Sequence, residues 1–64
     1  MKRYKVQDVI DLLESDGWYL NGWKGSHRHF ENLVKKGKVT VSGKPSDVLS
    51  QTVLNSIWKQ AGWR

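Results

Sequence analysis

The apolar positions at the start of the chain follow the pattern of an amphipathic helix. Between Tyr4 and Asp16 they recur at the i, i+3, i+4, i+7 spacing of one helical face, at Val6, Val9, Ile10 and Leu13. Acidic side chains fall between them and are expected to meet water. Gly17 follows directly and can adopt the left-handed conformation that ends many helices. We therefore predict a helix over residues 4–16.

The middle of the chain alternates between apolar and polar positions, which predicts strands. We expect the first strand at Trp18–Lys24. Its weak alternation puts Trp18 and Leu20 on one face of the strand and Tyr19, Asn21 and Trp23 on the other, and Gly22 is expected to loosen the strand.

A second strand is expected at His27–Leu33, joined to the first by a tight connection at Gly25 and Ser26. Alternation along this strand puts His27 and His29 on the same face, roughly 7 Å apart.

The last third of the chain predicts a loop, a strand and a helix. Lys35-Lys36-Gly37 suits a short hairpin loop in which Gly37 supplies a positive φ, and Lys38–Ser42 forms the third strand. Ser50 is the expected N-cap of the final helix, which stops at Gly62. The apolar stripe of this helix consists of Val53, Leu54, Ile57, Trp58 and Ala61.

This order of elements predicts an α+β fold of the α-β-β-β-α type. We expect residues 1–64 to form a single domain, with two helices on one face of a three-stranded antiparallel sheet. Trp18 and Trp58 are assigned to the core. The other face of the sheet, or an edge, would then be free for a ligand.

Charge is distributed unevenly along the chain. The total is +5, from 11 Lys and Arg against six Asp and Glu. Residues 5–17 hold four acids and one base, whereas residues 22–46 hold six bases and one acid. One segment is therefore suited to a polyanion and another is not, as in a nucleic-acid binder with a defined footprint. A basic surface without a partner fits the composition equally well.

Several classes of function are excluded by what the sequence lacks. It has no cysteine, which removes disulfide scaffolds, thiolate zinc sites and cysteine nucleophiles. It has no Gly-rich phosphate loop and no serine-hydrolase elbow. It has no apolar stretch that could cross a membrane or form a signal peptide, so we expect a cytoplasmic protein.

Two histidines inside the basic segment offer the most specific chemistry. His27 and His29 are the side chains whose ordinary pKa suits proton transfer near neutral pH. RNA carries its own nucleophile, the 2′-OH, so a nuclease that uses it needs a base for that proton and cations for the phosphate. A histidine among lysines and arginines meets those needs without a metal.

Other interpretations of the same residues stay open. A histidine in a basic protein is commonly a surface residue or a phosphate contact, and a His-x-His pair without further ligands is a weak metal site. The lysines at 35, 36 and 38 fit a solvated loop tip as well as a phosphate-binding one. Tyr19 and Trp23 suit base stacking, coverage of the sheet or contact with a protein.

Several short motifs follow one another along nearly the whole chain. They are Asp16-Gly17-Trp18-Tyr19-Leu20, Lys24-Gly25-Ser26-His27 with Phe30 three residues on, Val39-Thr40-Val41, and the ending Leu54-Asn55-Ser56-Ile57-Trp58-Lys59-Gln60-Ala61-Gly62. This ordered set resembles the HicA family of bacterial toxins. The resemblance implies a small domain similar to the double-stranded-RNA-binding fold. It also implies an mRNA-cleaving toxin that is held inactive by a HicB-type antitoxin.

The resemblance implies the role of the Gly-Ser-His motif. Its histidine, here His27, is expected to be the single essential catalytic residue, with Gly25 and Ser26 shaping the turn that presents it. No metal or other cofactor is implied.

Further roles rest on charge and spacing. Lys24 and Arg28 are expected to hold the scissile phosphate, and Lys35, Lys36 and Lys38 to follow the RNA backbone. His29 is the suggested general acid, with Lys24 or a solvent molecule as alternatives. The antitoxin is expected to cover this basic region with an acidic surface.

Two alternatives to a toxin remain. One is a non-catalytic RNA-binding module of the same fold, which reads duplex shape. The other is a protein-interaction domain that uses Trp23 and Trp63 as exposed anchors.

Overall fold

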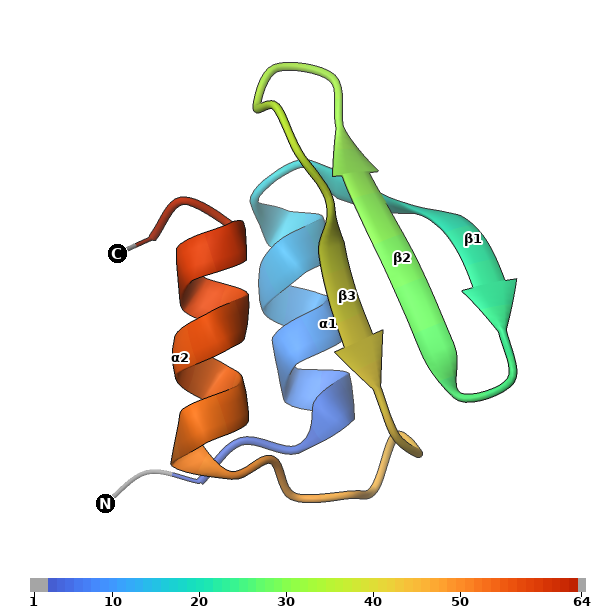
Figure 1. The fold of residues 1–64 in the computed structure, drawn as a ribbon, viewed down its shortest axis with the longest axis vertical. Helices are drawn as coiled ribbons and strands as arrows, with labels where there is room; N and C mark the ends of the chain where they lie inside the picture. Colours follow the sequence, from blue (N-terminus) through green and yellow to red (C-terminus); the bar gives the residue numbers. More distant parts are fainter. Residues whose placement is uncertain (1–2, 64) are drawn as a thin grey trace.

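The computed structural model describes residues 3–63 as a helix, three strands and a second helix. The elements are α1 (Val6–Ser15), β1 (Trp18–Lys24), β2 (His27–Asn32), β3 (Val39–Ser42) and α2 (Gln51–Gln60). The strands form one antiparallel sheet in the order β1-β2-β3, and both helices lie on the same side of it (Figure 1). The predicted α-β-β-β-α fold is confirmed.

The core lies between the helices and the sheet. It contains the predicted apolar face of α1, most of that of α2, and the inward residues of the strands: Val6, Val9, Ile10, Leu13, Trp18, Phe30, Val39, Val41, Leu54, Ile57 and Ala61. Trp58 packs against this cluster and is half-buried. Val53 was also expected in the stripe of α2, but it is 40% exposed because the buried face of the helix runs through Leu54 and Ile57.

The helix ends are set by local hydrogen bonds. The Ser50 hydroxyl accepts a bond from the Val53 backbone N–H at 3.3 Å, as expected of an N-cap, and Gly17 follows α1 with φ at +91°. Helix α1 starts later than predicted because Lys5 pairs instead with Val48 in an isolated bridge. Among residues 3–63, no helix is long and apolar enough to cross a membrane.

The loop between β2 and β3 is longer than the predicted three-residue connection. The Asn32 side-chain oxygen accepts bonds from the backbone N–H groups of Val34, at 2.8 Å, and of Lys35, at 3.2 Å. This local turn competes with the strand ladder, so β2 stops at Asn32 and Leu33 is 89% exposed. Residues 33–38 therefore form the loop, and β3 begins at Val39.

These connections give the sheet two distinct ends. The β1–β2 turn and the segment after β3 meet at one end, at the bottom of Figure 1, where Gly43 N–H donates to the Ser26 carbonyl at 3.1 Å. We call this the turn end, formed by residues 25–26 and 43–47. The β2–β3 loop, residues 33–38, forms the opposite end, at the top of Figure 1. We call this the loop end.

Candidate functional site

Strand β2 carries both histidines on the side of the sheet that faces away from the helices. Residues directly opposite each other in an antiparallel pair share a face, and the buried Val41 lies opposite Arg28. Arg28 is therefore on the helix side, and alternation puts His27 and His29 on the other. The prediction that the two histidines share a face is confirmed. We call this side of the sheet the open face; with the cross-strand partners it comprises Tyr19, Lys24, His27, His29, Glu31, Thr40 and Ser42.

A bulge in β1 decides which residues of that strand join the histidines. The register shifts between Leu20 and Gly22, which leaves Asn21 without a partner on β2. One extra residue reverses the alternation of every residue after it. Lys24 consequently lies directly opposite His27, on the open face.

The same bulge moves Trp23 to the helix side of the sheet, where it lies opposite Arg28. The prediction that Trp23 shares a face with Tyr19 is wrong, because the alternation of faces was carried across the irregularity expected at Gly22, whereas the bulge reverses it. Asn21 itself is held by its side-chain amide, which donates to the Glu31 carboxylate. The sequence signal for the bulge is Gly22, since a glycine inside a strand commonly marks one.

The two histidines differ in how firmly they are held. The His27 side chain is exposed and has no hydrogen-bond partner among residues 3–63. The His29 ring is half-buried, with Nδ1 3.2 Å from the Thr40 hydroxyl. It lies beside Gly22, where an added Cβ would come within 3.7 Å of the ring. His27 is therefore available to a ligand, whereas His29 is oriented by its neighbours.

His27 follows a two-residue turn of a well-defined type. Gly25 has φ at +59°, and no non-glycine residue of the described chain has a positive φ. A positive φ at the first central position alone is the type II′ pattern, which matches the twist of a hairpin. The predicted role of Gly25 and Ser26 in the turn agrees with this geometry.

The cations expected around His27 are brought together only in part. Lys24 is its direct neighbour across the strands. The Arg28 guanidinium lies on the opposite side of the sheet, where Nη1 donates to the Gly43 carbonyl at 2.9 Å. Lys44, which the sequence analysis did not single out, is near the site because it comes two residues after Ser42, the partner of His27 on β3. Lys44 lies near His27 because of the register between β3 and β2, which the local sequence pattern does not reveal.

The lysines of the β2–β3 loop lie at the loop end, far from His27. The length of β2 separates them, roughly 17 Å for the five residue steps from His27 to Asn32. Lys36 and Lys38 are exposed there. Lys35 instead forms an ion pair with Asp16 at 2.7 Å and also donates to the Ala61 carbonyl at 3.3 Å. Its ammonium group is thus engaged within the protein.

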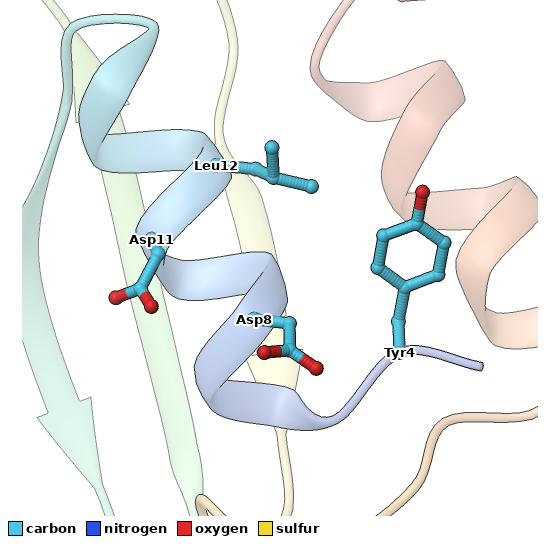
Figure 2. Close-up of a pocket in the computed structure, with 4 residues that line it drawn as sticks. All are labelled: Tyr4, Asp8, Asp11 and Leu12. Atoms are coloured by element: carbon cyan, nitrogen blue, oxygen red, sulfur yellow. The ribbon is translucent and has the colours of Figure 1, made fainter. Parts of the chain in front are cut away.

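A hollow lies on the other side of the molecule, beside the helices. Figure 2 shows Asp8 and Asp11 on one face of α1, with Leu12 directed toward Tyr4 across the gap to α2. None of the predicted site residues line it. Its carboxylates repel a polyanion, so the open face is the side of the described chain that suits nucleic acid.

The described residues offer no ready-made metal site. Within residues 3–63, no three His, Cys, Asp or Glu side chains gather closely enough to hold a metal ion. The chemistry available on the open face is instead that of an imidazole beside an ammonium group.

Comparison with models of known protein families gives a match that covers most of the chain. A family model described as the HicA toxin of bacterial toxin–antitoxin systems matches residues 6–63, which span every helix and strand of the fold. A search of curated proteins finds no significant match.

Proposed function

Because the chain belongs to the HicA toxin family of bacterial toxin–antitoxin systems, we propose that it cleaves mRNA with His27 as its catalytic base. The exposed His27 ring carries this proposal. It has no internal partner within residues 3–63, it follows the family-like Gly-Ser turn, and it lies opposite Lys24.

The proposed reaction uses the RNA as its own nucleophile. The His27 imidazole takes the proton of the 2′-OH, and the 2′ oxygen attacks the adjacent phosphorus. The bond from phosphorus to the 5′ oxygen breaks, and that oxygen takes a proton from a general acid or from solvent. The products are a 2′,3′-cyclic phosphate and a 5′-hydroxyl. DNA lacks the 2′-OH and is not a substrate.

Neighbouring side chains supply charge and orientation. The Lys24 ammonium shares a face with His27 and stabilises the negative charge that builds on the phosphate. His29, two residues along, is our candidate for the general acid, with Lys24 or solvent as alternatives. Lys36 and Lys38 bind the RNA backbone at the loop end, about 17 Å from His27 along β2. Lys35 and Arg28 stay predicted phosphate contacts, although both have partners inside the protein.

The proposed partner is a HicB-type antitoxin that acts in the same cytoplasm. The open face and the turn end present Lys24, Lys44 and His27 together. An acidic surface that covers them would block the catalytic base and exclude RNA in a single step.

The experiment that tests the function is cleavage of a mixed-sequence RNA in the presence of EDTA. We expect the wild type to cut and His27→Ala to be slower by about 10²–10⁴-fold, the usual contribution of general base catalysis. Both proteins should bind RNA alike. His29→Ala tests the proposed general acid: it should also slow cleavage if His29 protonates the leaving oxygen, and it should leave the rate near that of the wild type if Lys24 or solvent does so.

The products and the binding data separate the alternatives. Termini with a 3′-hydroxyl instead of a cyclic phosphate would rule out attack by the 2′-OH. RNA binding without cleavage by the wild type would favour the non-catalytic RNA-binding module, and His27 would then be a phosphate contact. Failure to bind RNA at all would favour the protein-interaction alternative.

A further inference from the structure

Trp23 is the most exposed aromatic side chain of the described chain, yet its orientation is tightly specified. It is 64% exposed and contributes nothing to the core. Its indole Nε1 nevertheless donates to the Gly25 carbonyl at 2.7 Å. A side chain that is oriented so strongly without being buried calls for a reason other than packing.

The contacts of Trp23 belong to a set of interactions that surrounds the β1–β2 turn. The Arg28 guanidinium lies over the indole, with Cζ 4.9 Å from the ring centroid. Arg28 also donates to the Gly43 carbonyl at 2.9 Å, and Gly43 N–H donates to the Ser26 carbonyl at 3.1 Å. The two carbonyl groups of the turn are thus held from two directions. We call Trp23, Arg28 and Gly43 the turn brace.

The turn needs this support because of its composition. Gly25 has no Cβ to restrict its φ, and nothing lies within 4 Å of the position where a Cβ would be. A glycine in open space can rotate its peptide planes at little cost. His27 is the second residue after Gly25, so any such rotation moves the base of its side chain.

We propose that Trp23 is a positioning residue for His27: with Arg28 it holds the Gly25–Ser26 turn and so determines where the imidazole lies. This inference rests on the proposed function, since it concerns the same catalytic base. A misplacement of about 1 Å can slow a reaction by about 10²-fold. Trp23 and Arg28 lie on the helix side of the sheet, so they act through the turn and not by touching the scissile phosphate.

Base stacking is the competing explanation for an exposed tryptophan in an RNA-binding protein. It predicts that loss of the ring weakens RNA binding and leaves the rate of the bound complex unchanged. Positioning predicts the reverse. The two explanations are therefore separated by measuring the affinity and the single-turnover rate independently.

The experiment compares Trp23→Ala and Trp23→Phe with the wild type. Trp23→Ala removes both the indole N–H and the ring beneath Arg28, and we expect its single-turnover rate at saturating RNA to fall about 10–100-fold. Trp23→Phe keeps the ring and should lose less. The Kd for RNA should change by less than about twofold in both variants, and the urea midpoint should move little because Trp23 lies outside the core.

Leu20→Ala is the matched control, because Leu20 is also a partly exposed residue on the helix side of β1 but lies opposite Phe30, away from the turn. It should leave the single-turnover rate near that of the wild type. A Trp23→Ala variant that loses affinity in proportion to its rate would overturn the proposal in favour of stacking, and an unchanged rate would overturn it outright.

The motion of the turn can be measured without RNA cleavage, so the positioning role of Trp23 can be tested separately from the proposed function. In Trp23→Ala we expect faster backbone motion and faster amide hydrogen exchange at Ser26 and His27, measured by NMR, with the exchange of core amides unchanged. Unchanged motion of the turn would overturn the positioning role even if the enzyme is active. A wild type that fails to cleave RNA would instead contradict the proposed function, whatever the turn does.

Discussion

Asp16 joins three other parts of the chain through a single carboxylate oxygen. Its Oδ2 accepts bonds from Lys35 Nζ at 2.7 Å, from Trp63 Nε1 at 2.9 Å and from Trp18 Nε1 at 3.1 Å. The bond from Lys35, followed by that from Trp63, holds the pKa of the Asp16 carboxyl below its ordinary value. The ionised form of Asp16 is therefore the one that the folded state prefers.

This preference predicts how stability depends on pH. Because the pKa of Asp16 is lower in the folded than in the unfolded state, its contribution is complete above the unfolded value of about 4. It is lost as the pH falls through the lower, folded value. Asp16→Asn should therefore lower the urea midpoint at pH 7, and its difference from the wild type should shrink between pH 4 and pH 2.

The control is Asp11→Asn, which removes an acid of α1 whose side chain accepts a hydrogen bond from Gln7 within the same helix. Its effect should be smaller than that of Asp16→Asn at pH 7. Equal effects of the two variants would mean that the bonds to Asp16 add no stability.

At the scale of single residues, the sequence predicted which side chains carry charge but not which charges are already paired. Lys35 and Lys36 are neighbours in a basic run and look equivalent. The fold directs Lys35 toward Asp16, 19 positions away in the sequence, and leaves Lys36 exposed. Local patterns contain no information on such a distant pair.

At the scale of elements, Gly43 links the end of β3 to the turn that precedes His27. Its φ is +111°, and an added Cβ would lie 3.2 Å from Asp47 Oδ2 and 3.3 Å from Val6 Cγ2. A side chain here would be strained in its backbone and crowded by its neighbours, which suits glycine alone.

Gly43→Ala should destabilise the protein by about 1–3 kcal/mol and slow cleavage, because the Gly43 N–H and carbonyl both belong to the turn brace. Gly37→Ala is the matched control. It has a similarly positive φ of +92°, but nothing lies within 4 Å of its Cβ position and it lies at the loop end. It should lower the urea midpoint without slowing cleavage. If Gly43→Ala and Gly37→Ala lost the same activity, Gly43 would have no specific role in supporting the turn before His27.

The helices and strands were largely predictable from the sequence, and each wrong prediction has an identifiable physical cause. Apolar periodicity located both helices and all three strands. Strand β2 ends early because the Asn32 side chain captures two backbone N–H groups. The face of Trp23 was mispredicted because alternation fails at a bulge, whose position depends on pairing with a second strand.

At the scale of the whole molecule, the two sides of the protein carry opposite character. The open face presents Lys24 and both histidines beside a single acid, Glu31, which accepts a bond from Asn21, whereas the hollow beside the helices is bordered by two acids, Asp8 and Asp11. A polyanion or an acidic protein is therefore drawn toward one side and repelled by the other. The uneven distribution of charge along the sequence predicted this separation. Only the fold shows where the two groups of charges lie, on the open face of the sheet and in the hollow beside the helices.

This polarity predicts the kinetics of antitoxin binding. The association rate of a HicB-type antitoxin, followed by stopped-flow fluorescence, should fall about tenfold or more as salt is raised from 50 to 500 mM, since steering is screened. Lys24→Gln should reduce the rate at low salt. Lys59→Gln, an equal change of charge on α2, should reduce it less. A rate that is independent of salt, or equally sensitive to both lysines, would contradict docking on the open face.

The bulge at Asn21 has a consequence for how this toxin can vary. Deleting that single residue would restore regular pairing in β1 with Leu20 still opposite Phe30 and Lys24 still opposite His27. Trp23 and Lys24 would therefore keep their present sides of the sheet. Inserting or removing a residue in the β2–β3 loop would not exchange any sides. A library of single deletions should therefore tolerate the loss of Asn21 as it tolerates the loss of a residue in the loop. Deletions within β2, which pairs on both sides, should instead be disruptive, because they shift the register against β1 and β3 together.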